Sequence, residues 1–251
     1  MSDPFCLGGE VVHVWTLDLS KAPPNGGDGE NWLCAEELAS SQRMGNVIVK
    51  QRFMRTRAGL RWLLGLYLDR HPTEVVFETG AHGKPRLAGT TDGSGLSFNV
   101  SHCGDLAMLA FAFDRRLGVD VEAMRPQRDL STLAERVLAA EELAAWRRLD
   151  ERKRVESFYR WWVCKEAFGK AVGLGIQVGF KSCVVEPDQP KLLRLPAEHG
   201  APSGWQLIML DMGSLYAAAV CYQGASATLR RADLTACWEH ESAFSEFMQM
   251  R

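Results

Sequence analysis

A short segment of the chain, Gly118-Val-Asp-Val-Glu122, places two carboxylates two positions apart. In an extended strand, residues i and i+2 lie on the same face, so Asp120 and Glu122 project together while the valines face a core. Neighbouring carboxylates repel each other unless a cation or a proton lies between them. Such oxygen ligands suit Mg²⁺, which is usually held by one or two carboxylates, water and substrate phosphates. The alternative is a half-buried strand with a solvated acidic face.

A second segment, from Phe158 to Lys170, repeats chemically useful side chains at helical spacing. On a helix, four of its residues occupy successive i+4 positions along one stripe: Phe158, Trp162, Glu166 and Lys170. The aromatic members would anchor the helix in a core, and the charged pair would lie at its rim. Lys165 lies one residue round the helix and would be free to contact an anion. An amphipathic helix with an exposed ion pair is the alternative interpretation.

A third segment, Phe98-Asn-Val-Ser-His102, contains a serine next to a histidine. On an extended chain adjacent side chains diverge, which argues against a nucleophile–base pair of Ser101 and His102. A pair of phosphate-binding donors, the hydroxyl and a ring nitrogen, fits the spacing better. A strand end that carries a hydrogen-bonded core histidine is equally compatible with the pattern.

The tripeptide Gly83-Lys84-Pro85 would hold one lysine at a loop tip, since glycine permits a tight turn and proline stiffens it. Alone, such a tripeptide usually marks a turn and nothing more. The chain has no G-x-x-x-x-G-K-[ST] pattern and no G-x-G-x-x-G after a strand. Their absence argues against a phosphate-cradling P-loop and against a dinucleotide-binding fold.

Positive charge is concentrated in one run of the N-terminal half. Between positions 43 and 61 there is no acidic residue, while six basic ones occur: Arg43, Lys50, Arg52, Arg55, Arg57 and Arg61. A solvated helix face is the common explanation for such a run. A cluster of one sign also suits phosphate binding, because the arginine fork makes bidentate contacts.

Hydrophobic periodicity predicts the elements that carry these segments. Strands are predicted at 11–17, 74–78, 106–113 and 117–122, the last two joined as a hairpin. Helices are predicted from 35 to 69, with a break near 45–46, and over most of 128–172. A β-rich region follows, with strands at 181–186, 205–211, 215–222 and 226–230. Both halves share the order strand, helices, strands, which suggests two similar α+β lobes meeting near Gly118.

Length and composition are those of an ordinary globular protein: 251 residues, 46% hydrophobic, with 29 basic and 31 acidic side chains and a net charge of −2. The near-neutral balance argues against binding nucleic acid or a membrane surface through net charge. No apolar run approaches transmembrane length, and the N-terminus lacks a signal-peptide pattern. Seven scattered cysteines without C-x-x-C spacing indicate free thiols in a cytoplasmic protein.

The motifs G-K-P, F-N-V-S-H, G-V-D-V-E and W-x-x-K-E-A-x-x-K follow one another between Gly83 and Lys170. This ordered set resembles the Sfp-type 4′-phosphopantetheinyl transferases, and the W-K-E-A form is similar to the subgroup that serves both fatty-acid and secondary metabolism. The resemblance implies a pseudo-dimeric α+β fold with lobes at 1–117 and 118–251 and an active site between them. It also implies a reaction. The 4′-phosphopantetheine of coenzyme A moves to a serine of an acyl or peptidyl carrier protein, releasing adenosine 3′,5′-bisphosphate.

The resemblance further implies roles for single residues. The Mg²⁺ ligands would be Asp120, Glu122 and Glu166, the last also a candidate base for the carrier serine. The catalytic groups would be Glu166, Lys170, Lys165 and His102. The contacts to coenzyme A would come from Arg52, Lys84, Ser101, His102 and Lys165.

The chain departs from the family at two positions before the N-terminal helix, where basic residues are common and Glu37 and Ser40 occur here. Binding of the 3′-phosphate would then rely on the run from Arg43 to Arg61. We expect a monomer that binds neither nucleic acid nor membrane. Two other functions are compatible with the motifs: a non-catalytic module that binds carriers or coenzyme A, and a Mg²⁺-dependent phosphohydrolase. The acidic trio argues against the pure binder, which has no need of a metal-ready set.

Overall fold

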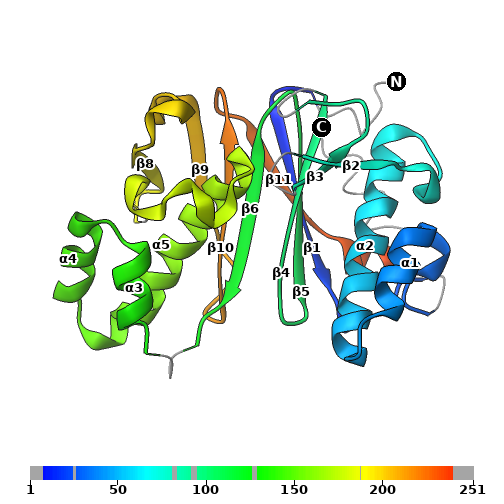
Figure 1. The fold of residues 1–251 in the computed structure, drawn as a ribbon, viewed down its shortest axis with the longest axis horizontal. Helices are drawn as coiled ribbons and strands as arrows, with labels where there is room; N and C mark the ends of the chain where they lie inside the picture. Colours follow the sequence, from blue (N-terminus) through cyan, green and yellow to red (C-terminus); the bar gives the residue numbers. More distant parts are fainter. Residues whose placement is uncertain are drawn as a thin grey trace.

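A computed structural model describes residues 8–24, 27–80, 84–91, 95–125, 129–186 and 188–239. Two β-sheets lie side by side in the centre, and helices cover the outer face of each sheet (Figure 1). The layers therefore follow the order helix, sheet, sheet, helix. This mixed α+β architecture confirms the predicted fold class.

The first sheet has the strand order β11-β1-β5-β4, and β1 is parallel to β11 but antiparallel to β5. Its strands are β1 (Val11–Asp18), β4 (Leu96–Cys103), β5 (Leu106–Phe113) and β11 (Thr228–Asp233). Helices α1 (Ala35–Gln42) and α2 (Val47–Leu68) lie outside it, and a small hairpin joins β2 (Phe77–Thr79) to β3 (Pro85–Leu87). The predicted helix break near 45–46 is confirmed: Asn46 caps α2 by accepting a hydrogen bond from the Val49 N–H at 3.1 Å.

The second sheet has the order β6-β10-β9, with every neighbouring pair antiparallel. Its strands are β6 (Leu117–Ala123), β9 (Trp205–Leu210) and β10 (Tyr216–Gln223). Outside it lie α3 (Ser131–Val137), α4 (Ala140–Arg148), α5 (Glu151–Val172) and the hairpin of β7 (Val184–Glu186) and β8 (Lys191–Arg194). The order β6-β10-β9 repeats the order β1-β5-β4, so the two halves share one topology.

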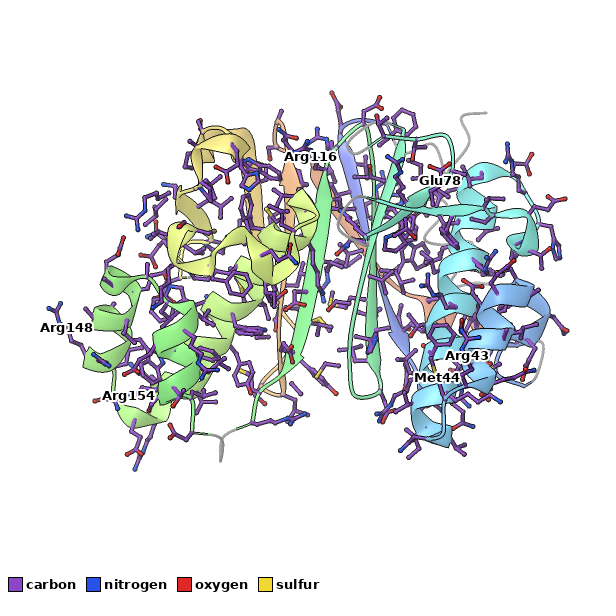
Figure 2. The ribbon with its side chains drawn as sticks, in the orientation of Figure 1. Arg43, Met44, Glu78, Arg116, Arg148 and Arg154 are labelled. Atoms are coloured by element: carbon purple, nitrogen blue, oxygen red, sulfur yellow. The ribbon has the colours of Figure 1, made fainter. Side chains whose placement is uncertain are left out.

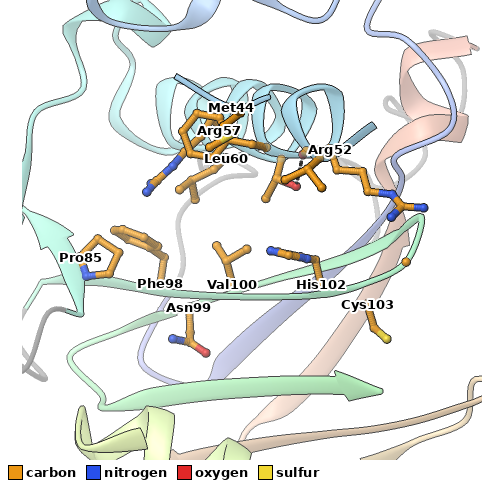
Figure 3. A pocket seen from close by; sticks show the side chains of 14 residues that line it. Met44, Arg52, Arg57, Leu60, Pro85, Phe98, Asn99, Val100, His102 and Cys103 are labelled. Carbon is orange, nitrogen blue, oxygen red and sulfur yellow. Dashed lines mark hydrogen bonds between the residues drawn. The ribbon is translucent and has the colours of Figure 1, made fainter. Parts of the chain in front are cut away.

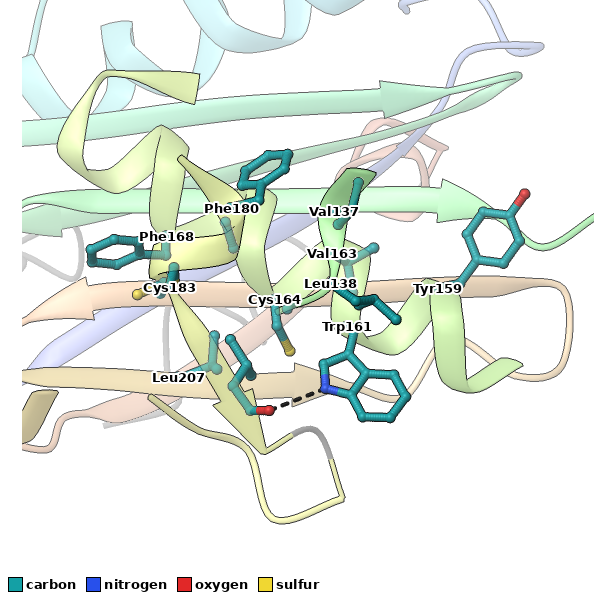
Figure 4. Packing of buried hydrophobic residues seen from close by; sticks show 14 of the residues in the cluster. Val137, Leu138, Tyr159, Trp161, Val163, Cys164, Phe168, Phe180, Cys183 and Leu207 are labelled. Carbon is teal, nitrogen blue, oxygen red and sulfur yellow. Dashed lines mark hydrogen bonds between the residues drawn. The ribbon is translucent and has the colours of Figure 1, made fainter. Parts of the chain in front are cut away.

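Apolar cores between neighbouring layers hold them together. One lies between α2 and the first sheet around Leu60, Leu63 and Leu64, and another lies between the two sheets around Val119 and Val121. A further core packs α5 against the second sheet, and Cys164, Phe168 and Leu207 are among its buried members (Figure 4). Short 3₁₀ helices complete the fold at Glu30–Trp32, Pro72–Glu74, Gly175–Val178, Phe180–Ser182, Ala197–His199 and Pro202–Gly204.

One prediction about topology is wrong. β5 and β6 do not form a hairpin, because β1 and β4 already occupy both edges of β5 and β6 begins the second sheet. The pairing of β1 with β5 joins distant segments, and local periodicity does not contain it. The last described segment returns to the first sheet: β11 pairs with β1, and α6 (Leu234–Glu239) packs on that sheet.

Six cysteines lie among the described residues, and all six are free thiols. Within the same part of the chain, no helix is long and apolar enough to cross a bilayer.

Candidate active site

Strands β4 and β6 are joined through side chains. Alternate residues of β4 accept hydrogen bonds from alternate N–H groups of β6: Asn99 Oδ1 from Val119 at 2.8 Å, Ser101 Oγ from Val121 at 3.3 Å and Cys103 Sγ from Ala123 at 3.3 Å. Since β10 pairs with the opposite edge of β6, these bonds satisfy the edge that faces the first sheet. The register brings the F-N-V-S-H segment beside the G-V-D-V-E segment.

Asp120 lies at the centre of this junction and is only 4% exposed. Its Oδ1 accepts hydrogen bonds from the Ser101 hydroxyl at 2.8 Å and from the Lys170 ammonium at 2.7 Å. Lys170 also donates to Ser101 Oγ at 2.7 Å. Oδ2 of Asp120 is buried and has no hydrogen-bond partner among the residues that the structure describes. A charged oxygen in that position has capacity for one more cation or donor.

The predicted stripe on α5 is confirmed. Phe158 is fully buried, whereas Trp162, Glu166 and Lys170 are half-buried along the side of the helix that meets β6. Gly118 makes the close approach possible: a Cβ there would lie 2.1 Å from the Ala167 carbonyl oxygen and 2.4 Å from the Ala171 nitrogen. The backbone of α5 therefore rests directly on β6, which brings Lys170 to Asp120.

Burial and a neighbouring negative charge disfavour the ionised forms of Glu122 and Glu166. Burial, then the charge of Asp120, raises the pKa of Glu122, although hydrogen bonds to Cys103 and Trp162 partly oppose the shift. Burial and Asp120 likewise raise the pKa of Glu166 to about 7, against the opposing charge of Lys170. Three carboxylates thus share a region with one ammonium group, and a further cation there would be stabilised.

The opposite face of β4 borders a cavity. His102 and Val100 point toward α2, while Asn99 and Cys103 point the other way (Figure 3). The cavity has a volume of about 640 Å³, and its polar lining comes from Arg52, Arg57, Thr56 and His102. Partial burial, followed by the charges of Lys170 and Arg52, lowers the pKa of His102. The predicted divergence of Ser101 and His102 is therefore observed.

A second cavity of about 370 Å³ adjoins the first and shares Pro85, Asn99 and Val100 with it. It extends between the sheets to Lys84, Lys170 and the turn after α5. Lys84 Nζ donates to the carbonyl oxygens of Leu117 at 2.9 Å and Lys170 at 2.8 Å. Lys84 therefore ties β3 to the second sheet and its helix at the edge of this cavity, while Gly83 lies outside the described residues.

Comparison with known proteins decides the family. Residues 116–221 match the model of the 4′-phosphopantetheinyl transferase superfamily. The 4′-phosphopantetheinyl transferase HetI of Nostoc is 35% identical over 217 residues, which cover 86% of this chain and 89% of HetI. The chain belongs to the 4′-phosphopantetheinyl transferase superfamily. Other members are similar over shorter stretches. The Bacillus pumilus 4′-phosphopantetheinyl transferase psf-1 is 36% identical over 64% of this chain and 70% of its own. The Xenopus laevis L-aminoadipate-semialdehyde dehydrogenase-phosphopantetheinyl transferase is 30% identical over 68% and 60%.

Lys165 does not have the position that a coenzyme A contact would require in this transferase. Its side chain is fully buried, and Nζ lies 2.7 Å from Oε2 of Glu142. The same ammonium donates to the carbonyl oxygens of Phe180, at 2.7 Å, and Cys183. Glu142 in turn accepts from the N–H groups of Ala139 at 2.7 Å and Val185 at 2.8 Å. The expectation that Lys165 faces an anion is corrected: it fastens α5 to α4 and β7 from behind the site.

The basic run on α2 is largely paired, although no acid lies within it. Its carboxylate partners come from distant segments: Asp105 for Arg52 and Asp28 for Arg55, both at 2.8 Å, and Glu37 for Arg57 at 3.7 Å and Arg61 at 2.5 Å. Arg61 is buried and also donates to the Pro72 and Val75 carbonyls. The acidic residue at position 37, where the family often has a base, is thus a counter-ion for two arginines.

The side chains of this region have the chemistry of ligands for a divalent cation. Asp120, Glu122 and Glu166 are hard oxygen donors, Asp120 has an unpartnered buried oxygen, and the neighbouring carboxylates have raised pKa values. Within the described part of the chain, however, no three His, Cys, Asp or Glu side chains already form a metal-sized cluster. Lys170 supplies the positive charge at Asp120 in this arrangement.

Motif reasoning missed three residues whose side chains join the elements around the site: Asn99, Cys103 and Glu142. The first two share the period-two spacing of Ser101 and could have been found by extending that alternation along the strand. Glu142 occupies the third position of α4 and closes its capping box, a pattern that signals a helix start but not a partner in α5.

Proposed function

We propose that this chain transfers the 4′-phosphopantetheine group of coenzyme A to a serine of acyl and peptidyl carrier proteins, releasing adenosine 3′,5′-bisphosphate. The observation that carries the proposal is the cluster of Ser101, Asp120 and Lys170 at the junction of the two sheets. It lies beside a cavity with a basic lining, in a chain of the transferase family. In this proposal the repeated topology forms two pseudo-twofold-related lobes with the active site between them.

Coenzyme A would lie in the cavity between α2 and β4. Arg57 and His102 line it, and Arg52 stands at its wall in an exposed ion pair that a phosphate can replace. The apolar wall around Phe98 and Val100 suits the uncharged parts of the molecule. Lys84 and Lys170 reach the adjoining cavity, so the groove contains basic groups along its whole length.

The ligands of a divalent cation would be Asp120, through its unpartnered Oδ2, together with Glu122 and Glu166. Mg²⁺ bound there would neutralise the pyrophosphate charge and act as a Lewis acid on a phosphoryl oxygen. The role of Ser101 is then to orient Asp120 through its hydroxyl hydrogen bond, since the buried serine itself does not face the coenzyme A cavity.

In the chemical step, the oxygen of the carrier serine attacks the phosphorus attached to pantetheine. The bond from that phosphorus to the bridging oxygen breaks, and adenosine 3′,5′-bisphosphate leaves with both bonding electrons. Glu166, half-buried on α5 beside Asp120 and Lys170, is the group that would take the serine proton. Lys170 would donate to the phosphate oxygens and stabilise the charge that develops on them.

Mass spectrometry of apo acyl and peptidyl carriers tests the proposal, after incubation with coenzyme A and Mg²⁺. We expect a mass gain equal to one phosphopantetheine on the acceptor serine, and its loss in Asp120→Asn. The exposed Asp114→Asn, on the β5–β6 connection, is the matched control and should retain wild-type transfer. Unmodified carriers across the whole panel would reject the proposal in favour of a binding module. Phosphate or pantetheine phosphate released without a carrier would favour a hydrolase.

A further inference from the structure

The first turn of α2 exposes three consecutive apolar side chains. Val47, Ile48 and Val49 are 67%, 56% and 51% exposed. β-branched residues are weak helix formers, and a solvent-facing run of them stabilises neither the helix nor a core of this chain. Grouped exposed apolar residues of this kind usually mark a surface that another molecule covers.

The same turn is electropositive. It contains no acidic residue, and the N-terminal end of a helix carries partial positive charge from its backbone dipoles. Arg43 precedes the helix and Lys50 lies in its first turns. Within the described ranges, neither has a carboxylate at ion-pair distance, in contrast to the arginines further along α2. An anionic partner with apolar side chains complements this combination.

The other basic region that could attract such a partner has exposed basic side chains but no exposed apolar run among the described residues. At the junction of α4 and α5, on the opposite side of the molecule, Arg147 pairs with Glu135 at 2.6 Å (Figure 2). The guanidinium of Arg154 donates to the backbone of Leu149 and Arg147 and lies over the ring of Trp146. The charges of Arg147 and Arg154 are therefore used within the fold, and the described part of this region offers no apolar contact surface beside its remaining basic residues.

The apolar turn also leads into the site. Met44 and Val49 line the 640 Å³ cavity at one end, and His102, Cys103 and Gly104 line it along β4. Figure 2 places Arg43 and Met44 at the end of α1 and α2 that carries this turn. A partner seated on the turn would therefore lie next to the cavity that we assign to coenzyme A.

We propose that the surface formed by Arg43, Met44, Val47, Ile48, Val49 and Lys50, the α2 entry surface, docks the carrier protein through an acidic helix with apolar contact residues. The inference rests on the proposed function. A symmetric dimer through this surface is disfavoured, because it would bring Arg43 and Lys50 against their own copies. A carrier bound here would present its serine to the cavity that holds the phosphopantetheine donor.

Binding of a carrier whose acceptor serine is replaced by alanine tests the surface without turnover. The test variant is Ile48→Asp. This substitution should not destabilise the fold, because an acidic side chain in the first turn interacts favourably with the helix dipole. The controls are Leu193→Asp and Leu215→Asp, at positions 55% and 70% exposed on the second half of the molecule. We expect the Kd for the carrier to rise at least tenfold in Ile48→Asp and in Lys50→Glu, and to stay within twofold in both controls. The KM for coenzyme A should stay within twofold in Ile48→Asp and in both controls.

Several results would overturn the inference while leaving the transferase proposal intact. One is a wild-type enzyme that modifies carriers and an Ile48→Asp variant with unchanged carrier Kd. A second is a dimer that sedimentation detects in the wild type but not in Ile48→Asp, while the carrier Kd is unchanged. A third is wild-type binding to anionic phosphatidylserine vesicles that Ile48→Asp loses, again with an unchanged carrier Kd. If wild-type protein modifies no carrier, the proposed function fails first, and that result is read by mass spectrometry independently of the variants.

Discussion

Substitution of Lys165 by methionine is the sharpest test of how this site is held together. The change removes an ammonium group with no exposed surface and keeps a chain of similar length. It leaves the Glu142 carboxylate buried with only its two backbone donors, and it strips the Phe180 and Cys183 carbonyls of their shared donor. Breaking a buried ion pair on one side costs about 3–5 kcal/mol, because the remaining charge stays desolvated.

That cost should be measurable by thermal and denaturant unfolding. For a chain of this size, about 1 kcal/mol lowers the Tm by about 2–4 °C, so Lys165→Met should lose about 6–20 °C. Glu142→Gln in the same chain should recover part of the loss, with a coupling of about 1–3 kcal/mol in a double-mutant cycle. The matched control is Lys153→Met, an exposed lysine on the same helix, which should change stability by less than about 0.5 kcal/mol.

Kinetics separate a structural Lys165 from one that binds phosphate. At a temperature where the variant is folded, the KM for coenzyme A should stay close to the wild-type value, because Nζ faces the interior of the second half. A Lys165→Met protein with nearly unchanged stability and a strongly raised KM for coenzyme A would refute the structural assignment. It would support the phosphate contact that the sequence motif predicts.

Three other substitutions test the site. Gly118→Ala pushes a methyl group into the backbone of α5; we expect a loss of about 1–3 kcal/mol and a fall in kcat of at least tenfold, whereas Gly204→Ala, which has open space around it, should be neutral in both assays. Glu166 has a pKa of about 7 in the fold against an ordinary 4.5, so its proton stabilises the metal-free protein at low pH. The Tm without metal should therefore fall as pH rises from about 4.5 through 7, and Glu166→Gln should flatten that slope; an unchanged slope contradicts the assignment. Arg52→Met breaks only an exposed pair with Asp105, so it should raise the KM for coenzyme A with a stability change below about 1 kcal/mol, as two separate measurements would show.

Local periodicity was sufficient for the parts of the site that one element determines. The i+2 spacing placed Asp120 and Glu122 on one side of a strand, and the i+4 spacing aligned Trp162, Glu166 and Lys170. Both patterns depend only on the geometry of the strand and the helix that carry them. For the same reason, the helix break at Asn46 and the divergence of Ser101 from His102 could be predicted.

The errors arose where a side chain's partner lies far along the chain. The helical position of Lys165 was predicted as correctly as that of Glu166. The partners of its ammonium group, Glu142 in α4 and two carbonyls after α5, could not be predicted from spacing. The basic run appears uncompensated in the sequence because Glu37 reaches it from the preceding helix. Pairing of β5 with β4 and β1, rather than with β6, is equally a tertiary choice.

The pairing of β11 with β1 in the first sheet has a consequence for how the polypeptide folds during synthesis. Residues Val11–Thr16 pair in parallel with Thr228–Asp233, and the Thr235 hydroxyl accepts from the Asp18 N–H at 2.9 Å. A nascent chain therefore completes its N-terminal sheet only after β11 has left the ribosome, and that long loop closure slows folding. Cutting the gene between the two halves would yield an N-terminal fragment with an open sheet edge, prone to aggregate. The two halves share a topology, but the N-terminal half needs a strand from the C-terminal half to complete its fold.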